Sequence, residues 1–256
     1  MKKILFRSVL ILLCVASLVA IVINLNASKS TIRVMSYNIR NGIGMDDLKD
    51  YQRTANVIMK IRPNFVALQE VDSVTGRSNK VDLLLELAKL TKMYPTYGSA
   101  ISFDGGKYGV GILSRKKPLM TKNIALPGRE EARTLLIVEY PQYVVMATHW
   151  SLTEEDRIAS VAIINEQAQA FQKPLFLVGD FNAEPNSIEL NLLSDKWVNL
   201  SPNLPTYPAD NPVETIDYIW GYRGSHFSYE CQNTLVVEEP LASDHRPIYS
   251  DIVLKK

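Results

Sequence analysis

The sequence contains almost no cysteine, no long run of basic residues and no internal repeat. Its two cysteines are Cys14, within an apolar N-terminal segment, and Cys231, so the rest of the chain cannot form an intrachain disulfide framework. The net charge is only +1, so the chain lacks the excess of basic residues that is typical of a strong duplex-DNA-binding protein. The absence of low-complexity tracts and long linkers leaves a compact domain whose stability comes from its core.

The first 28 residues differ from the rest of the chain. Lys2, Lys3 and Arg7 precede an uncharged run, residues 8–28, that is rich in Leu, Ile and Val. The run is long enough to cross a bilayer core of about 30 Å as a helix, and a charged start before an apolar segment is also typical of a secretory signal. Because the run is long for a signal peptide, we favour an uncleaved membrane anchor over a cleaved signal. Either one predicts that the following domain lies outside the cytoplasm, because the basic residues stay on the cytoplasmic side.

Residues 29–256 have the length of one domain with a full core. Short β-type runs predict strands at 31–39, 65–71, 108–114, 134–140, 143–150, 174–181, 216–221 and 247–254. Helical periodicity appears at 47–61, 80–91 and 154–171. The third helix begins at "SLTEED", with Thr153 or Ser151 as the N-cap. Many strands with few helices indicate stacked sheets that carry helices on their outer faces.

Several of these apolar runs end in, or contain, a carboxylate, a carboxamide or a histidine. The residues are Asn38, Glu70, His149, Asp180 followed by Asn182, and Asp217, and the last predicted strand is preceded by "SDHRP". Each of these residues alone is typical of a turn, a cap or a solvated surface. As a set, they offer the oxygen ligands that Mg²⁺ prefers and imidazoles that transfer protons near neutral pH. The pattern therefore indicates phosphate chemistry at one end of a sheet.

Seven motifs carry a family resemblance: "SYNIR", "ALQEVD", "YGVGILSR", "THW", "GDFNAEP", "IDYIW" and "SDHRP". In this order, over residues 31–254, the chain resembles the endonuclease/exonuclease/phosphatase superfamily. That group includes DNase I, the AP endonucleases, neutral sphingomyelinases and inositol polyphosphate 5-phosphatases. The resemblance implies an α/β fold of the DNase I type: a four-layer α/β/β/α sandwich with the active site at one end of the two packed sheets.

The resemblance also implies a metal site. Glu70 corresponds to the principal Mg²⁺ ligand, Asn38 lies beside it, and Asp244 sits close to the metal in relatives. Mn²⁺ is expected to substitute for Mg²⁺.

The remaining motifs imply the catalytic groups. Asp180 and Asn182 resemble the pair that orients the attacking water and a phosphate oxygen. Asp217 and His245 resemble an Asp–His dyad in which the carboxylate fixes the tautomer of the imidazole and favours its protonated form. His149 resembles a second histidine, set against a non-bridging or leaving oxygen. Whether His245 or Asp180 takes the proton of the water is left open.

Two departures separate the chain from the AP endonucleases. Those enzymes carry an acid where this chain has Arg40, and they lack a histidine at the position of His149. Their phosphate-facing tyrosine aligns with Lys107, although the neighbouring Tyr108 is an equal candidate for phosphate binding. Arg133 is a further candidate for a substrate contact, with a surface salt bridge as the alternative. The chain therefore resembles the DNase I, sphingomyelinase and 5-phosphatase branches more closely.

These observations predict an exported, membrane-anchored, Mg²⁺-dependent phosphoesterase that acts as a monomer. Water would attack a phosphodiester or phosphomonoester directly, without a covalent enzyme intermediate. The low net charge, the anchor and His149 favour a small-molecule or lipid substrate. The alternatives are a DNase-type endonuclease acting on nucleic acid and a catalytically inactive binding module of the same fold.

Overall fold

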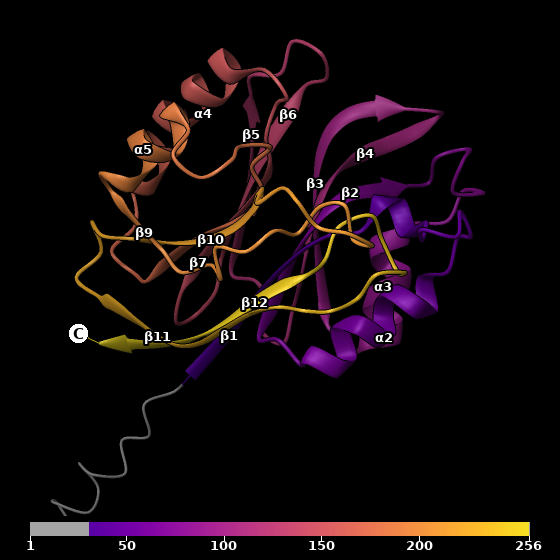
Figure 1. The fold of residues 1–256 in the computed structure, drawn as a ribbon, viewed down its shortest axis with the longest axis horizontal. Helices are drawn as coiled ribbons and strands as arrows, with labels where there is room; N and C mark the ends of the chain where they lie inside the picture. The colour runs from indigo at the N-terminus through magenta and orange to yellow at the C-terminus, as the bar shows by residue number, and fades with distance from the viewer. Residues whose placement is uncertain (1–30, 256) are drawn as a thin grey trace, which may run out of the picture. The chain divides into compact units, whose positions relative to one another are not determined.

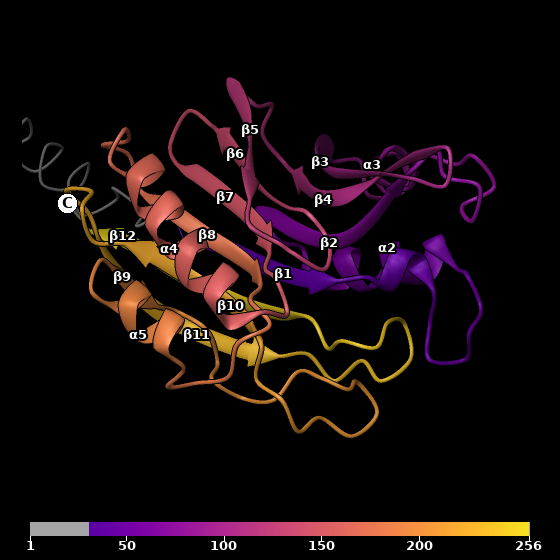
Figure 2. The same ribbon diagram turned by 90° about the horizontal axis from the view of Figure 1, so that it is seen from above.

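The computed structural model describes residues 31–255, and the predicted anchor or signal, residues 1–28, lies outside them. Two six-stranded sheets pack face to face, and helices cover the outer face of each sheet (Figures 1 and 2). The predicted α/β/β/α order of layers is confirmed. Within residues 31–255, no helix is both long and apolar enough to span a bilayer.

Each sheet has one parallel pair of strands at its centre. The first sheet follows the spatial order β11 (Ser228–Val236), β12 (Ile248–Lys255), β1 (Thr31–Asn38), β2 (Phe65–Ser73), β4 (Gly106–Ser114) and β3 (Tyr94–Phe103). The second follows the order β5 (Met120–Leu126), β6 (Arg133–Glu139), β7 (Val144–His149), β8 (Leu175–Asp180), β10 (Asp217–Tyr222) and β9 (Trp197–Asn199). The β1–β2 and β7–β8 pairs are parallel, and every other neighbouring pair is antiparallel.

Strand alternation sorts neighbouring side chains into different layers. In β1, Val34 joins the core between the two sheets, whereas Met35 belongs to the core beneath the helices of the first sheet. In β7, Val145 faces the space between the sheets and Met146 faces the helices of the second sheet. Because a strand buried on both faces needs apolar residues at every position, these strands appear in the sequence as continuous apolar runs.

Helices α2 (Tyr51–Ile61) and α3 (Leu83–Thr91) cover the first sheet, and α4 (Glu154–Ala168) and α5 (Ile188–Ser194) cover the second. A short 3-10 turn, η1 (Arg40–Gly42), follows β1. Asp50 and Asp82 cap α2 and α3 by accepting hydrogen bonds from backbone N–H groups. At α4, Thr153 is the N-cap residue but makes no side-chain cap bond, and the hydroxyl of Ser151 accepts the N–H of Thr153 instead.

All eight predicted strands are present, and all eight lie in the interior of a sheet. The four strands missing from the sequence prediction are β3, β5, β9 and β11, which form the four sheet edges. An edge strand exposes one side to water, and β5 and β11 have mostly exposed or half-buried side chains, so they carry no apolar run. The short helix α5 was missed as well.

Candidate active site

The two sheets deliver polar side chains to the same end of the sandwich. Asn38 is the last residue of β1, and Asp180 is the last residue of β8. Within the second sheet, Asp180 pairs in register with His149 of β7 on one side and with Asp217 of β10 on the other. The side chains of Asn38 and Asp180 meet across the sheets, where the Asn38 amide donates to Asp180 Oδ2 at 3.0 Å. The predicted convergence of strand ends is therefore observed.

The loop that carries "SDHRP" is held in place from both sides. Ser243 Oγ donates to the carbonyl of Asn38 at 2.8 Å, which attaches the loop to the end of β1. On the other side, the Ala209 N–H donates to the carbonyl of Asp244 and the Arg246 N–H donates to the carbonyl of Thr206. These main-chain bonds fix His245 between the two sheets although it lies in a loop.

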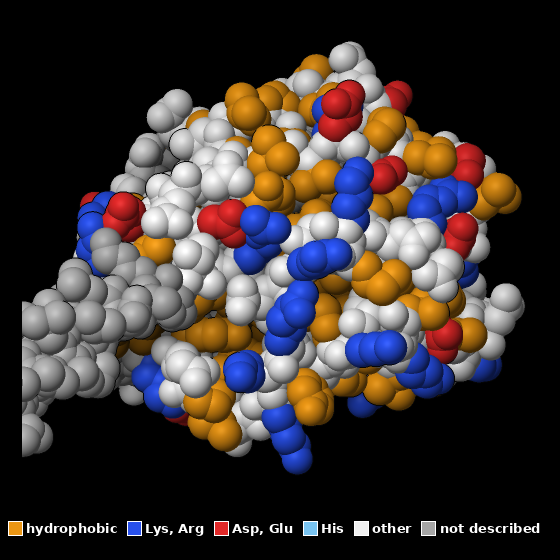
Figure 3. Space-filling view, turned by 90° about the horizontal axis from the view of Figure 1, so that it is seen from below, with side chains coloured by type: hydrophobic (Ala, Val, Ile, Leu, Met, Phe, Trp, Pro, Cys, Tyr) orange, Lys and Arg blue, Asp and Glu red, His pale blue; other side chains and the backbone are white. Residues whose placement is uncertain are grey.

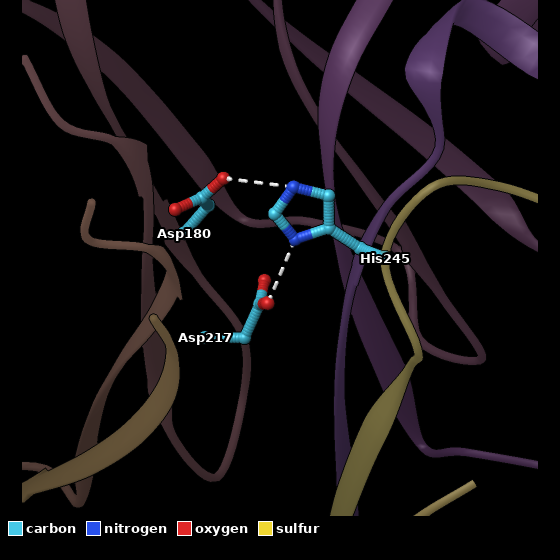
Figure 4. Close-up of side chains that lie close together, drawn as sticks. All are labelled: Asp180, Asp217 and His245. Carbon is cyan, nitrogen blue, oxygen red and sulfur yellow. Dashed lines mark hydrogen bonds and ion pairs between the residues drawn. The ribbon is translucent and has the colours of Figure 1, made fainter. Parts of the chain in front are cut away.

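His245 and Asp217 form the predicted dyad geometry (Figure 4). Nδ1 of His245 lies 2.9 Å from Asp217 Oδ2, and the Thr206 hydroxyl donates to the same oxygen at 2.6 Å. The ring of Tyr207 packs against the imidazole with 4.8 Å between ring centroids. Burial by itself would lower the pKa of His245, but the charge and hydrogen bond of Asp217, together with nearby acids, raise this pKa to about 10. The imidazole is therefore held in its protonated form.

Asp180 lies at the centre of the cluster. Its Oδ2 faces Nε2 of His149 at 3.5 Å and Nε2 of His245 at 3.7 Å, in addition to the Asn38 amide. Its Oδ1 accepts the N–H of Asn182 at 3.0 Å. Ligand-type atoms of Asp180, Asp217 and His245 all lie within 4.8 Å of one another. Both ring nitrogens of His245 face carboxylates, an arrangement that favours holding a proton over coordinating a cation.

The second histidine has the opposite electrostatic environment. His149 is buried, and burial lowers its pKa to about 4 against the attraction of Asp180; the nearby Arg133 acts in the same direction as burial. His149 is therefore neutral at physiological pH, while His245 is charged. The resemblance predicted a protonated ring only for His245, and the burial that keeps His149 neutral could not be read from the sequence.

The strand that carries Glu70 is longer than predicted. The sequence predicted a strand at 65–71, whereas β2 continues to Ser73, and its pairing with β4 shifts register between Leu68 and Val71. Glu70 occupies this bulge with a φ of 58°, a left-handed conformation that is uncommon outside glycine. The bulge turns the carboxylate toward the cleft, where the Asn38 amide donates to it at 3.1 Å. Strain of this kind concentrates at functional sites.

An open cleft of about 360 Å³ lies over this cluster. Eight of the predicted site residues line it: Glu70, Tyr108, Arg133, His149, Asp180, Asn182, Asp244 and His245. Asn38 and Asp217 are buried and do not line it; they hold Asp180 and His245 in place. Lys107 is exposed and does not line the cleft, so of the two open candidates the structure places Tyr108 at this surface.

Five further residues line the cleft and were not found by sequence reasoning: Glu131, Leu152, Tyr207, Glu214 and Ile216. Two of the five had a signal in the sequence: Glu131 shares the segment "EEART" with Arg133, and Ile216 begins the motif "IDYIW". Leu152, Tyr207 and Glu214 lie outside the regular strands and helices and belong to none of the motifs. Their positions depend on loop shape, which the sequence does not show.

Arg133 is a buried cation at the cleft wall. Its guanidinium lies 3.0 Å from Glu131 and 3.5 Å from Glu130, and it is only 8% exposed. Its buried Nε has no hydrogen-bond partner among the described residues. The sequence left two alternatives for Arg133, a substrate contact or a surface salt bridge. The structure shows features of both: the side chain forms ion pairs, but it is buried and lines the cleft. Arg133 is therefore positioned to contact an anion as well.

The oxygen donors of the cleft suit a hard divalent cation. Glu70, Asp180 and Asp244 face the same space, and the pKa of Glu70 is raised by burial and by its two acidic neighbours against the hydrogen bond from Asn38. A divalent ion would relieve this repulsion, and such ions bind carboxylate oxygens. Asn38 turns its amide nitrogen toward the carboxylates while its oxygen accepts the N–H of Arg40, so it would bind a cation only after its amide turns over.

The comparisons with known proteins agree with this geometry. A family model described as "Endonuclease/Exonuclease/phosphatase family" matches residues 35–245. No curated protein matches the chain. Among solved structures, the chain is similar to an endonuclease/exonuclease/phosphatase from Beutenbergia cavernae, with 24% identity and a TM-score of 0.71 over 88% of this chain and 72% of that chain.

Two other solved structures carry more specific descriptions. A mannosyl-6-phosphatase from Bacteroides thetaiotaomicron is 15% identical, with a TM-score of 0.70 over 87% of this chain and 99% of that chain. The catalytic domain of human Nocturnin with a bound sulfate anion is 20% identical, with a TM-score of 0.66 over 88% of this chain and 94% of that chain. At these identities the similarity shows a shared fold.

Proposed function

The chain belongs to the endonuclease/exonuclease/phosphatase family, and from this premise we propose that it is a metal-dependent hydrolase of phosphate esters. One observation carries the proposal. Both sheets bring their polar strand ends to a single cleft, where acidic oxygens, two imidazoles and a buried guanidinium face one another. A binding module that had lost catalysis would have no need to keep the dyad, the strained Glu70 and the buried Asp180 together.

Glu70 and Asp244 are the residues that would hold Mg²⁺ or Mn²⁺, with Asn38 as a third ligand if its amide turns over. Once bound, the ion would stabilise negative charge on the phosphate oxygens. The side chains that face the cleft must then supply the orientation of water and the movement of protons.

We assign the movement of protons to Asp180 and His245. His245 is kept protonated by Asp217, so it suits the donation of a proton to the leaving oxygen or the stabilisation of phosphate charge. Asp180 Oδ2 lies among three nitrogen atoms, from Asn38, His149 and His245, so its position suits the acceptance of the proton from the attacking water. Of the two candidates that the sequence left open, we therefore propose Asp180 as the base.

A second group of residues at the cleft would bind the phosphate. Arg133 presents a fork of N–H donors, and Tyr108 lines the cleft with its pKa raised by burial, so its hydroxyl keeps its proton and can donate. His149 is neutral and can donate one N–H without adding charge. The side-chain nitrogen of Asn182 is already bonded to the Trp150 carbonyl at 2.9 Å, which fixes its orientation.

A small phosphate ester fits the cleft better than a nucleic acid. Arg133 is the one Lys or Arg side chain among the residues lining the cleft within 31–255, and it is already paired with Glu131. Glu214 lines the same cleft and makes no side-chain hydrogen bond or ion pair with the described residues. A nucleic-acid backbone would need several cations along its path, whereas carboxylates on the wall suit the hydroxyl groups of a small molecule. The fold shared with a mannosyl-6-phosphatase supports this preference.

A hydrolysis panel tests the proposal. Purified protein would be assayed with and without Mg²⁺ and Mn²⁺ against a bis-aryl phosphate, aryl and sugar phosphomonoesters, inositol phosphates, sphingomyelin and plasmid DNA. We expect turnover of at least one small ester that stops after chelation and returns when metal is added. Turnover that survives chelation, or no hydrolysis of any phosphate ester with either metal, would contradict the proposal. Plasmid cleavage faster than all small esters would select the endonuclease alternative.

We also propose that residues 1–28 anchor the protein in a membrane with the catalytic domain outside the cytoplasm. The support is the charged start followed by the long uncharged run of residues 8–28. Fractionated cells should hold the full-length chain in the membrane, and protease added to spheroplasts should degrade the domain. Protection of the domain would overturn export, and a soluble mature form that begins near Ser28 would select a cleaved signal.

A further inference from the structure

The end of the first sheet that lies away from the cleft carries an unbalanced set of basic residues. Three segments meet there: 57–64 at the end of α2, 89–95 at the end of α3, and 115–120 after β4. They contain seven basic residues and no acid, and we call these the basic patch: Lys60, Arg62, Lys89, Lys92, Arg115, Lys116 and Lys117. The whole chain carries +1, so all other residues together carry −6. The patch is therefore strongly positive, whereas the rest of the chain has a net negative charge.

The basic patch is largely unpaired, in contrast to cations elsewhere in the described chain. Lys60, Arg62, Lys92, Lys116 and Lys117 are exposed, and their side chains make no hydrogen bond or ion pair within residues 31–255. Outside the patch, cations such as Arg33, Arg53, Arg77, Arg129 and Lys173 each bond to a carboxylate. Unpaired cations packed together repel one another, so a ligand of negative charge would stabilise them.

The ends of the helices explain only part of the patch. Lys60, Arg62, Lys89 and Lys92 lie at or just beyond the carboxyl ends of α2 and α3, where cations offset the helix dipole. Arg115, Lys116 and Lys117 belong to no helix, and they extend the patch along the loop after β4.

Exposed apolar side chains lie among these cations. Met59 is 39% exposed, Tyr94 is 49% exposed and Leu119 is 63% exposed. A hollow of about 300 Å³ joins the three segments, and its lining combines Arg62, Lys92 and Arg115 with methionine and proline side chains. Figure 3 looks at the molecule from the side of α2 and α3 and shows Lys and Arg side chains among hydrophobic ones. Basic residues mixed with methionine, leucine and tyrosine match the headgroup region of a bilayer that contains anionic phospholipid, where the surface is negative and the layer beneath is apolar.

The chain enters the domain directly beside the patch. The Asn64 N–H donates to the carbonyl of Arg33 in β1, and the Arg115 N–H donates to the carbonyl of Asn64. The uncharged run of residues 8–28 ends only three residues before β1 begins at Thr31. A connection this short brings the start of β1, and with it the patch, close to any membrane that holds the run.

We propose that the basic patch docks on the surface of an anionic phospholipid bilayer and orients the anchored domain there. This rests on the proposed membrane anchor. Asn38 lies five residues along β1 from Arg33, about 16 Å at 3.3 Å per residue, so the cleft opens away from the docked edge. The docked enzyme therefore takes its substrate from the water phase and not from lipids of the bilayer that holds it. This narrows the substrate class to soluble phosphate esters.

Lysine footprinting tests the docking on the full-length protein in nanodiscs. A water-soluble acylating reagent is applied with purely zwitterionic lipid and with lipid that contains phosphatidylglycerol. We expect acylation of four lysines to slow at least about fivefold in the anionic nanodiscs: Lys60, Lys92, Lys116 and Lys117. A fivefold change is what the attraction of one basic side chain to an anionic lipid surface would produce. The protection should vanish at about 0.5 M NaCl, where charges are screened. Lys80 and Lys196, which are exposed and lie outside the patch, should react equally in both lipids.

Two matched variants sharpen this test. The variant Lys116→Glu/Lys117→Glu should lose the protection of Lys60 and Lys92, whereas Lys80→Glu/Lys196→Glu, with the same change of net charge, should keep it. Equal labelling of the patch in both lipids overturns the docking, as does protection of the patch by duplex DNA without protection by anionic lipid.

The failure of the other proposals would look different. If the full-length chain does not insert into nanodiscs, the anchor proposal fails, and the same footprint with added anionic vesicles still decides the docking. Hydrolysis of a bis-aryl phosphate in the same samples reports on the active site alone. Rapid hydrolysis of phospholipid in the protein's own nanodisc would overturn the outward orientation of the cleft.

Discussion

The two ends of the first sheet treat charge in opposite ways. At the end that carries Asn38 and Glu70, most charged groups are buried or half-buried, and most face a partner of opposite charge or a hydrogen-bond donor. At the end that carries Arg62 and Lys92, the charges are exposed and most have no partner within residues 31–255. Buried charge is costly unless it is paired and hydrogen-bonded, and such arrangements cluster at functional sites. Exposed charge of one sign costs little and acts by summing many weak attractions.

This difference predicts how each end responds to mutation. At the buried end, the residues act as a unit, so single substitutions should have large and non-additive effects on turnover. At the exposed end, they should leave turnover of a soluble substrate unchanged.

The largest effect is expected for the dyad. His245→Ala should lower kcat/KM by about 10²–10⁴-fold, as the loss of positioned proton transfer does. Asp217→Asn should cost nearly as much, because the amide no longer holds the imidazole in its charged form. The double variant should be little worse than the poorer single variant. Steady-state kinetics of the four proteins, with circular dichroism as the folding control, check this, and fully multiplicative losses would mean that the two residues work independently.

Arg133 should come next. Arg133→Gln removes a charged donor from the cleft wall and leaves Glu131 unpaired, so kcat/KM should fall by about 10–100-fold. Arg133→Lys keeps the charge without the planar fork and should recover part of this loss. The same kinetic assay decides, and equal activity of the three proteins would show that Arg133 serves only its ion pairs.

Tyr108 and Lys107 should differ more modestly. Tyr108→Phe removes one hydroxyl from the cleft, and we expect a fall in kcat/KM of about 3- to 10-fold. Lys107→Gln should change it less, because Lys107 does not line the cleft. If Lys107→Gln lowered kcat/KM more than Tyr108→Phe on the same substrate, Lys107 would be the residue that contacts the phosphate, as the alignment with the AP endonucleases suggested.

The smallest effect belongs to the exposed end. Lys116→Glu/Lys117→Glu should change kcat/KM for a soluble substrate by less than about twofold, because distant surface sites rarely couple. A large loss in detergent solution, with no bilayer present, would mean that the two ends of the sheet are coupled.

How much the sequence predicts follows the same division between buried and exposed parts. Interior strands were found because burial on both faces demands apolar runs, and site residues were found because those runs stop at Asn38, His149 and Asp180. Edge strands such as β5 were missed because solvent exposure removes the apolar run. The bulge at Glu70 depends on its pairing with β4, which no local pattern encodes. Tyr207 and Glu214 reach the cleft through a loop whose path is set by tertiary contacts.

The central claim is that the buried end holds a divalent metal through Glu70. Direct Mn²⁺ binding, followed by electron paramagnetic resonance without substrate, tests it on the wild-type protein and on Glu70→Gln. The variant keeps the size of the side chain but loses the charge that faces a hard cation. We predict saturable binding by the wild-type protein and at least about tenfold weaker binding by the variant, as the loss of a ligand charge implies. Equal Mn²⁺ affinity in the two proteins, or no binding by the wild type, would contradict the account.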